Sequence, residues 1–378
     1  MPSEPLNKGL RNVVLDETQA SFIDGEEGIL LYRGYSIHDL AAKSSFEEVS
    51  YLLLYGELPT RAEMGAFEAR LRRGRALPPA VIDVLRVVKD AHPMDALRTG
   101  VSALSAFDPD VEDNTLAGVL RKSERMIGQL AGVVATHHRL RQGLEPVAPR
   151  DDLNSAANFL WQLTGAEPTD EAVAAMDLDF ILHAEHGANA SSFAARVTVS
   201  TLADFHSAIV SAIGTLKGPL HGGAAESVMK MALEIGEPER ASEYVRERQK
   251  QRTNRIMGFG HRVYKVEDPR ARHMRAKSKA LSERTGHQKW YEILEAVEKE
   301  MSRYQRHGIY VNVDFFAGSV YYLLGIPEDL FVPIFAIGRV PGWCASVLEQ
   351  LQNNLLIRPL LRYEGPMDVK YVPIHERK

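Results

Sequence analysis

Residues 45–56 read Ser-Phe-Glu-Glu-Val-Ser-Tyr-Leu-Leu-Leu-Tyr-Gly, and their pattern indicates the fold class of the whole chain. Ser45, with Glu48 three residues later, forms a capping box, which is typical of a helix N-terminus. Apolar side chains then recur at helical spacing: Phe46, Val49, Leu52 and Leu53. Gly56 ends the run, so this stretch predicts a short amphipathic helix.

The same helical pattern continues along most of the chain. Thr60 and Glu63 form a second capping box, which opens a helix that we expect to end near Gly74, and Pro78-Pro79 starts another. Further helices are predicted over 115–142, 151–164, 169–186, 192–215, 223–235, 239–254, 270–285, 289–305, 314–324, 327–337 and 341–355. The alanine-rich helices 151–164 and 192–215 lack a wide polar face and should be buried. The fold class is therefore mainly α.

The clearest strand signal lies between residues 20 and 40. Glycines separate two short apolar runs, Ile23-Asp24-Gly25 and Gly28-Ile29-Leu30-Leu31-Tyr32-Arg33-Gly34-Tyr35. Glycine-punctuated apolar runs of this length predict a small β-hairpin near the N-terminus.

Length and composition set limits on the class of protein. A chain of 378 residues is long enough for more than one domain, and its net charge of −5 argues against a nucleic-acid partner. Cys344 is the only cysteine, so an intrachain disulfide is impossible. The start, Met-Pro-Ser-Glu-Pro, is not typical of a signal or transit peptide, and no uninterrupted apolar run approaches membrane-spanning length. We expect a cytoplasmic protein without a membrane partner.

Three short segments place an ionisable residue where an ordinary helix would not. The first is Gly218-Pro219-Leu220-His221-Gly222-Gly223, directly before the helix predicted from residue 223. The positive end of a helix dipole disfavours imidazolium, so His221 should be neutral and able to donate a hydrogen bond to a developing enolate oxygen. The alternative is a histidine that only satisfies a loop carbonyl.

The second segment is Gly258-Phe259-Gly260-His261-Arg262. It is not a dinucleotide fingerprint, since it lacks the third glycine and the preceding strand. Gly258 and Gly260 would allow a ligand to approach the backbone closely. Arg262 and Lys265 lie beside the loop and could hold the phosphates of a nucleotide-like substrate, whereas the later basic residues up to 279 are typical of a solvated helix face.

The third segment is Asn312-Val313-Asp314-Phe315-Phe316. Asp314 is either the N-cap of the following helix or a base in a poorly solvated site. Burial would raise the pKa of its carboxyl and a helix N-terminus would lower it, and the sequence leaves the balance open.

Four other residues need explanation. His183 and His186 stand three apart and could bind a metal, but no third ligand is evident and HExxH is absent, so we predict no metal site; His186 could instead contact a substrate. Arg339 and Arg358 lie in apolar surroundings and require an anionic partner, either a protein carboxylate or a bound dicarboxylate.

In this order and number, these motifs resemble the citrate synthase family, in particular its shorter bacterial and archaeal members. The resemblance covers nearly the whole chain and rests on Gly28–Tyr35, Ala91-His92-Pro93-Met94, Gly218–Ala224, Gly258–Arg270 and Asn312–Phe316. It implies a homodimer of two-domain helical subunits. Residues 1–222 and 326–378 would form a large, dimerising domain, and residues 223–325 a small domain that closes over the site.

The resemblance also implies a role for each residue. Asp314 would take a proton from acetyl-CoA, His221 would bind the thioester oxygen, and His261 would protonate the keto oxygen of oxaloacetate. Oxaloacetate would be held by His186, Arg270, Arg339 and, across subunits, Arg358. Coenzyme A would contact Gly258, Gly260, Arg262 and Lys265, and no metal or redox cofactor would be needed.

Three rivals stay open at this point. A 2-methylcitrate synthase shares the implied fold and catalytic residues but takes propionyl-CoA, which is one methylene longer. A non-catalytic helical binding protein could use the basic region 255–279 for RNA, although the net charge opposes it. A metal-dependent hydrolase using His183 and His186 would be inhibited by chelators.

Overall fold

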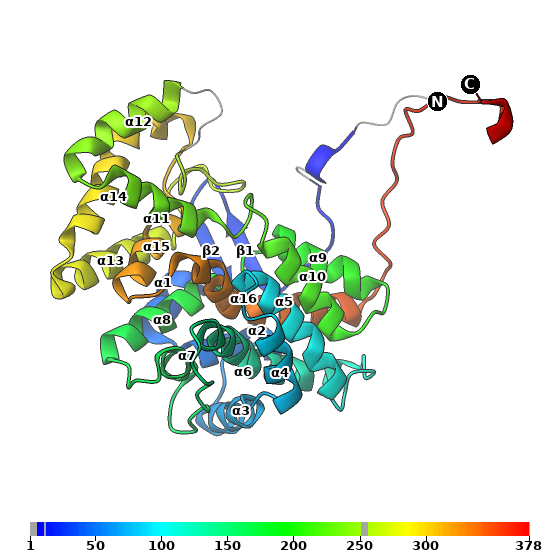
Figure 1. Cartoon of the computed structure of the whole chain (residues 1–378), viewed down its shortest axis with the longest axis horizontal. Helices are drawn as coiled ribbons and strands as arrows, with labels where there is room; N and C mark the ends of the chain where they lie inside the picture. Colours follow the sequence, from blue (N-terminus) through cyan, green and yellow to red (C-terminus); the bar gives the residue numbers. More distant parts are fainter. Residues whose placement is uncertain (1–5, 11–12, 251–255, 378) are drawn as a thin grey trace.

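The chain folds into packed helices with one small sheet near its N-terminus (Figure 1). This computed structural model describes residues 6–10, 13–250 and 256–377. The predicted fold class, mainly α with a small N-terminal β-hairpin, is confirmed.

The predicted hairpin is confirmed as the first two strands of a three-stranded antiparallel sheet in the order β1-β2-β3. The strands are β1 (Ser21–Asp24), β2 (Ile29–Tyr32) and β3 (Tyr35–Ser36). Ser21 pairs with Tyr32 and Asp24 with Ile29, so residues 25–28 form the turn between β1 and β2. The Asp24 carboxylate accepts hydrogen bonds from the backbone N–H groups of Glu26 (2.9 Å) and Glu27 (3.0 Å), which closes this turn.

Five helices follow the sheet: α1 (Ile37–Lys43), α2 (Phe46–Tyr55), α3 (Arg61–Gly74), α4 (Pro79–Val87) and α5 (Pro93–Leu104). The complete capping box of Thr60 and Glu63 is confirmed. At α2 only half of the predicted box forms, because the Glu48 carboxylate accepts from the Ser44 hydroxyl at 2.5 Å instead of the Ser45 backbone. We did not predict α5, although Pro93 at its first position was a usable signal.

The middle of the chain forms α6 (Leu116–Arg141), α7 (Ser155–Thr164), α8 (Asp170–His183), α9 (Ala190–Ser200) and α10 (Phe205–Leu216). The single helix predicted over 192–215 is wrong, because the chain turns between α9 and α10. Leu202 adopts a left-handed φ of 65°, and the Asp204 carboxylate caps α10 by accepting from Ser207 N at 3.0 Å. Apolar residues flank this turn on both sides, so the sequence pattern predicted one continuous helix.

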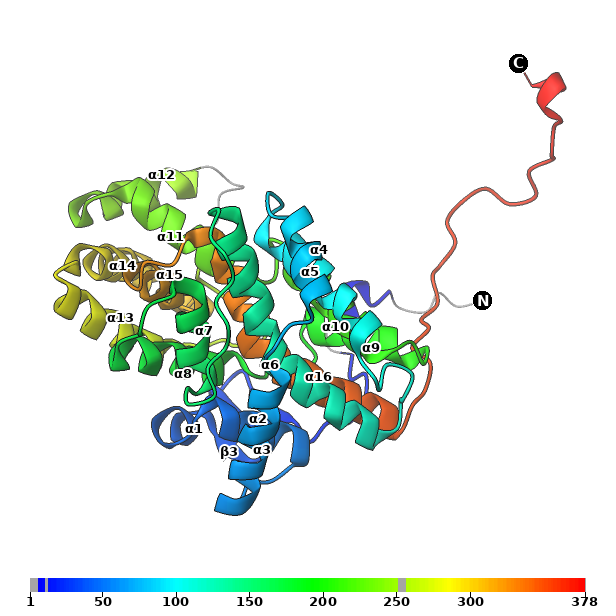
Figure 2. The same cartoon turned by 60° about the horizontal axis from the view of Figure 1, so that its bottom comes forward.

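The next helices pack mainly on one another and lie on one side of the molecule in both views (Figures 1 and 2). They are α11 (Ala224–Ile235), α12 (Ala241–Lys250), α13 (Ala271–Thr285), α14 (Gln288–Met301) and α15 (Asp314–Leu323). The helix predicted over 239–254 reaches into residues 251–255, which lie outside the described residues.

The last helix, α16 (Phe331–Gln352), replaces the two helices predicted over 327–337 and 341–355. Pro341 suggested a break, yet the helix runs through it, because burial along almost its whole length outweighs the loss of one backbone hydrogen bond. From Glu328 to Gln352 this segment has the length and composition of a membrane span, contrary to our expectation, and its apolar window is wholly buried inside the protein.

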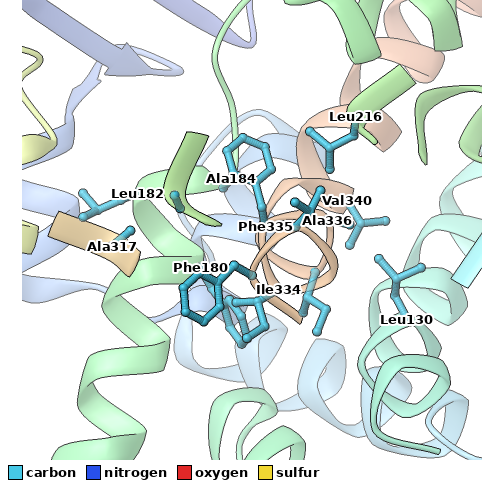
Figure 3. Packing of buried hydrophobic residues seen from close by; sticks show 14 of the residues in the cluster. Leu130, Phe180, Leu182, Ala184, Leu216, Ala317, Ile334, Phe335, Ala336 and Val340 are labelled. Carbon is cyan, nitrogen blue, oxygen red and sulfur yellow. The ribbon is translucent and has the colours of Figure 1, made fainter. Parts of the chain in front are cut away.

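The hydrophobic core is organised around α16. Figure 3 shows its side chains pointing outward in different directions toward neighbouring helices. These helices include α2, α6, α8, α9 and α10. Beyond α16, residues 353–377 leave the body as an extended segment ending in a short 3₁₀ helix, Ile374–Glu376 (Figure 2).

Candidate active site

His221 lies in the turn between α10 and α11, three residues before α11 begins, as predicted. Its Nε2 lies 2.8 Å from the Ser191 hydroxyl and accepts a hydrogen bond from the Ser191 backbone N–H at 3.2 Å. A backbone N–H can only donate, so Nε2 carries no proton in the neutral ring and the proton resides on Nδ1. Burial, followed by the nearby positive charge of Arg339, lowers the pKa of His221 to about 4. This direction agrees with the predicted neutral ring, although its causes are burial and Arg339 and not the helix dipole on which the prediction rested.

His261 follows the glycine loop and has the opposite tautomer. Its Nδ1 accepts from the backbone N–H groups of Val263 (3.0 Å) and Tyr264 (3.2 Å), which leaves the proton on Nε2. Burial, with the charge of Arg270, lowers the pKa of His261 to about 4. Two neutral histidines therefore each present one defined N–H donor.

The two glycines before His261 have different surroundings, and both have a left-handed φ of 79°. A Cβ on Gly258 would lie 2.6 Å from the Phe315 ring and 2.8 Å from Val228, so this glycine allows the loop to pack against α15 and α11. Around Gly260 no atom of the described residues lies within 4 Å of such a Cβ. The open side of the loop is therefore at Gly260.

Asp314 is the first residue of α15, and its side chain makes no capping hydrogen bond. The capping alternative is therefore wrong. Its Oδ1 is buried without a hydrogen-bond partner among the described residues. Burial is the largest influence and raises the pKa of Asp314, while His183 and Arg270 act in the opposite direction. A partly buried carboxylate with one unpartnered oxygen and a raised pKa is a better base than an ordinary aspartate.

Backbone contacts join the loop of His261 to the segment that carries Asp314. Phe259 and Val311 form an isolated β-bridge, and Asn312 N donates to Gly258 O at 2.9 Å. The Asn312 side chain donates to Gly260 O (3.1 Å) and accepts from Asp314 N (3.1 Å). Two segments about fifty residues apart in the sequence are thus held side by side.

Two buried arginines supply positive charge. Arg270 is 3% exposed and forms a bidentate ion pair with Asp268, with Nε–Oδ1 at 3.0 Å and Nη2–Oδ2 at 2.7 Å. Arg339 is 1% exposed and lies over the Phe335 ring, and its Nε donates to His183 O at 2.5 Å. It has no ion pair with any described carboxylate, so the protein salt bridge that we considered for it is absent.

Besides burial, the positive charges of these two arginines lower the pKa of the histidines in the site. Arg270 lowers the pKa of both His186 and His261, and Arg339 lowers that of His186 and His221. Arg339 itself has a pKa lowered to about 10, first by burial and then by Arg270. Arg270 is paired with Asp268, whereas Arg339 has no ion pair among the described residues, so the guanidinium of Arg339 is free to bind an anionic ligand.

His183 and His186 do not form the metal pair that we considered. Helix α8 ends at His183, whose Nδ1 lies 2.9 Å from Asp179 O, while His186 lies beyond the helix with Nε2 3.1 Å from the Tyr264 hydroxyl. Within the described ranges, no group of three or more His, Cys, Asp or Glu side chains is placed to hold a metal ion. His186 packs instead against His261, with ring centroids 5.0 Å apart.

The remaining predicted site residues lie at the edge of this site or away from it. Arg262 and Lys265 are exposed on the segment that follows His261. Arg358 is exposed on the extended C-terminal segment, which leaves the body of the chain in both views. The structure thus gathers His186, His221, His261, Arg270, Asp314 and Arg339, and leaves Arg358 apart.

Sequence reasoning missed several supporting residues. The Ser191 hydroxyl lies 2.8 Å from both His221 Nε2 and Asn189 Oδ1 and accepts a hydrogen bond from Trp343 Nε1 at 3.0 Å. Asn189 caps α9, so the Asn-Ala-Ser pattern after Gly187 was an available signal. Asp268, two residues before Arg270, was a second available signal. No local sequence pattern marked Tyr264.

Comparison with known proteins decides the family. The model of the family described as citrate synthase, C-terminal domain, matches residues 9–360. The chain belongs to the citrate synthase family. It is 47% identical to the citrate synthase of Deinococcus radiodurans, with 98% of this chain and 99% of that protein covered. It is also 43% identical to 2-methylcitrate synthase 1 of Corynebacterium glutamicum over the full length of both proteins.

Solved citrate synthases share this structure. The crystal structure of the Pyrobaculum aerophilum citrate synthase matches with a TM-score of 0.94 and 42% identity, covering 100% of this chain and 97% of that one. The Thermoplasma acidophilum citrate synthase, in its ternary complex with carboxymethyl coenzyme A and oxaloacetate, matches with a TM-score of 0.95 and 35% identity over 99% of this chain and 100% of that one. The predicted family and its helical fold are confirmed.

Proposed function

We propose that this enzyme condenses acetyl-CoA with oxaloacetate and hydrolyses the resulting citryl-CoA to citrate and coenzyme A. The observation that carries the proposal is the unpartnered carboxylate of Asp314, in one site with two neutral histidines of defined tautomer. Such a set can remove a proton from carbon, stabilise the enolate and supply a proton to a second oxygen.

The first step forms the nucleophile. Asp314 takes a proton from the thioester methyl group, and the electron pair moves onto the thioester oxygen. His221 donates its Nδ1–H to that oxygen, because Nε2 is already engaged by Ser191. A positioned base supplies about 10²–10⁴-fold, so the hydrogen bond to the enolate oxygen must provide much of the remaining acceleration.

The second step forms the carbon–carbon bond. The enolate carbon attacks the keto carbon of oxaloacetate, and the keto oxygen takes the Nε2 proton of His261. Water then attacks the citryl thioester carbonyl and the carbon–sulfur bond breaks. One proton of the water goes to the leaving coenzyme A thiolate and the other to His261, and Asp314 releases its proton to solvent. Because none of these steps changes the overall oxidation level of the substrates, we propose that no metal or redox cofactor takes part.

Substrate binding follows from the distribution of charge. The two carboxylates of oxaloacetate would meet His186, Arg270 and Arg339, of which Arg339 has no protein ion pair among the described residues. Arg262 and Lys265 would hold coenzyme A phosphates beside the loop shaped by Gly258 and Gly260, since both cations are exposed next to the open side at Gly260.

We further propose a homodimer in which the partner subunit's Arg358 completes the site. In support, the segment after α16 carries large exposed side chains that one subunit alone does not cover: Leu355, Leu360, Leu361, Tyr363, Met367, Val369, Tyr371 and Ile374. An exposed apolar segment of this kind is typical of a protein interface. The location would be cytoplasmic, consistent with a buried, unpaired Cys344.

The domain division follows the packing. Helices α11–α15 contact each other more than they contact the rest, which supports a small domain over residues 223–325 and a large one over 1–222 and 326–378. In the proposed mechanism the small domain contributes His261, Arg270 and Asp314, so closure of the two domains would assemble the site and exclude water.

The test is thiol release from acetyl-CoA, measured with and without oxaloacetate. We expect release only with oxaloacetate, and Asp314→Ala should lower kcat by at least about 100-fold because the base is lost. Glu26→Ala, a change at an exposed side chain, serves as the control. Release that is independent of oxaloacetate, or unchanged in Asp314→Ala, would overturn the proposal.

A second candidate is 2-methylcitrate synthesis from propionyl-CoA, which the 43% identity to the Corynebacterium glutamicum enzyme favours. One methylene in an apolar pocket is worth about 1–3 kcal/mol, or about 10- to 200-fold in specificity. The ratio of kcat/KM for acetyl-CoA and propionyl-CoA decides between the two, and a propionyl preference of tenfold or more would establish the second.

A further inference from the structure

We propose that the β1–β2 hairpin is a strap that connects the backbone around His186 with the backbone around His261 and sets their relative position in the domain arrangement described here, with Ser21 and Gly25 as its positioning residues. The hairpin contacts the segment that carries each histidine, one at each of its ends. The inference rests on the proposed function, in which both histidines bind oxaloacetate, and it gives a task to a part of the chain that carries no catalytic group.

One end of the hairpin is fixed beside His186. The Ser21 hydroxyl donates to Glu185 Oε1 at 3.2 Å and accepts from the Gly187 backbone N–H at 3.1 Å. The residues on both sides of His186 are therefore bonded to one side chain of β1. Ile23 also packs on Gly187, where an added Cβ would lie 3.2 Å from its Cδ1.

The same end is anchored deeper in the protein by Tyr32, the β2 partner of Ser21. Tyr32 is fully buried, and its hydroxyl lies 3.2 Å from both Ile181 O and Leu182 O at the end of α8. It also accepts from Glu185 N at 3.3 Å. This end of the hairpin therefore moves with the backbone that leads into His186.

The other end, the turn at residues 25–28, is fixed beside His261. Lys265 N donates to Gly25 O at 2.8 Å. The two backbones are in such close contact that a Cβ on Gly25 would lie 2.4 Å from Val263 O. A Cβ on Gly28 would meet Val266 at 2.9 Å. The turn therefore lies directly against residues 263–266.

Two of those residues, Val263 and Tyr264, determine which ring nitrogen of His261 carries the proton. The backbone N–H groups of Val263 and Tyr264 bind its Nδ1 and so direct the Nε2 proton toward the substrate. The Tyr264 hydroxyl lies 3.1 Å from His186 Nε2, so the chain from the turn through Tyr264 leads back to the first histidine. The contacts therefore run from Ser21 beside His186, through Gly25, to the segment that holds His261. They return to His186 through the Tyr264 hydroxyl.

Gly25→Ala tests the strap at this contact. The φ of Gly25 lies outside the left-handed region, so alanine can adopt its backbone. Its methyl group would have to move from 2.4 Å to at least the 3.0 Å below which real Cβ contacts are essentially never found, which displaces the Val263 backbone by at least 0.6 Å. A displacement of about 1 Å at a catalytic group lowers the rate by about 100-fold, so we expect kcat to fall by roughly 10- to 100-fold.

The matched control is Glu26→Ala, the next residue of the same turn, whose side chain is exposed. It should keep wild-type kcat and KM. A second variant, Ser21→Ala, removes the contacts beside His186 without adding bulk, and it should weaken oxaloacetate binding measured by calorimetry in the absence of acyl-CoA. This variant decides the question if Gly25→Ala does not fold.

A double-mutant cycle separates positioning from general damage. If Gly25 acts through His261, then adding Gly25→Ala to His261→Gln should lower kcat by less than twofold further. An equal loss in both backgrounds, or wild-type kinetics in Gly25→Ala and unchanged oxaloacetate affinity in Ser21→Ala, would overturn the strap. A wild-type enzyme that releases no thiol in the presence of oxaloacetate would instead contradict the proposed function.

Discussion

Each of the three ionisable residues proposed for catalysis is held in one state by its immediate surroundings. Ser191 N fixes the proton of His221 on Nδ1, and the backbone after His261 fixes its proton on Nε2. Burial keeps both rings neutral by lowering their pKa to about 4, and it raises the pKa of Asp314. The same physical effect therefore prepares two donors and one base.

The directions of these three pKa shifts predict how kcat/KM depends on pH. The active form has Asp314 ionised and both histidines neutral. As pH falls, Asp314 should gain its proton at a higher pH than an ordinary aspartate, because burial raises its pKa, and the two histidines should gain theirs near their pKa of about 4. Activity should therefore fall on the acid side, and it should not rise as pH falls through the ordinary histidine pKa of about 6.5.

The measurement is kcat/KM for acetyl-CoA across pH 4–9 at saturating oxaloacetate. An activity that increases as pH falls through about 6.5 would show that one histidine acts as imidazolium, and the tautomers derived from Ser191 and Val263 would then be wrong.

At the scale of elements, α16 positions the site because two glycines let it approach the end of α8. A Cβ on Gly342 would lie 2.2 Å from Ala184 O and 2.4 Å from Glu185 Oε2, and one on Gly338 would lie 3.0 Å from His183 Cβ. This close packing brings Arg339, one residue after Gly338, against the backbone of His183. The position of Arg339 is thus a property of helix packing.

Gly342→Ala should lower the free energy of unfolding by about 1–3 kcal/mol or more, because the methyl group overpacks against backbone. The matched control is Gly65→Ala in the exposed part of α3, where nothing lies within 4 Å of the added methyl group. That change should raise the free energy of unfolding by about 0.4–1 kcal/mol. Urea denaturation of both variants gives the comparison, and a Gly342→Ala protein of wild-type stability would contradict the packing argument.

At the scale of the molecule, one chain leaves Arg358 and the apolar C-terminal segment away from its own site (Figure 2). If the partner subunit's Arg358 completes each site, two inactive homodimers should complement one another. Subunits with Asp314→Ala and with Arg358→Ala, mixed by refolding, form heterodimers in which one of the two sites has both native residues. Random pairing should restore about a quarter of wild-type activity.

The control for this experiment is each variant refolded alone, which should stay inactive. Solution mass from light scattering must show a dimer in every sample. A mixture that recovers no activity would place Arg358 within its own subunit's site, and an active Arg358→Ala homodimer would place Arg358 outside any site.

Features with a local cause could be predicted from the sequence. The capping box at Thr60, the glycine-bounded hairpin and the helical periodicity each depend on residues within a few positions of one another. The tertiary structure decided the rest, because burial and long-range contacts set it. It showed that α16 continues through Pro341, that burial rather than capping governs Asp314, and that Arg339 has no ion pair among the described residues. Tyr264 contacts His186, and Gly25 contacts the backbone of Lys265, across long distances in the sequence, so no local pattern could have revealed these contacts.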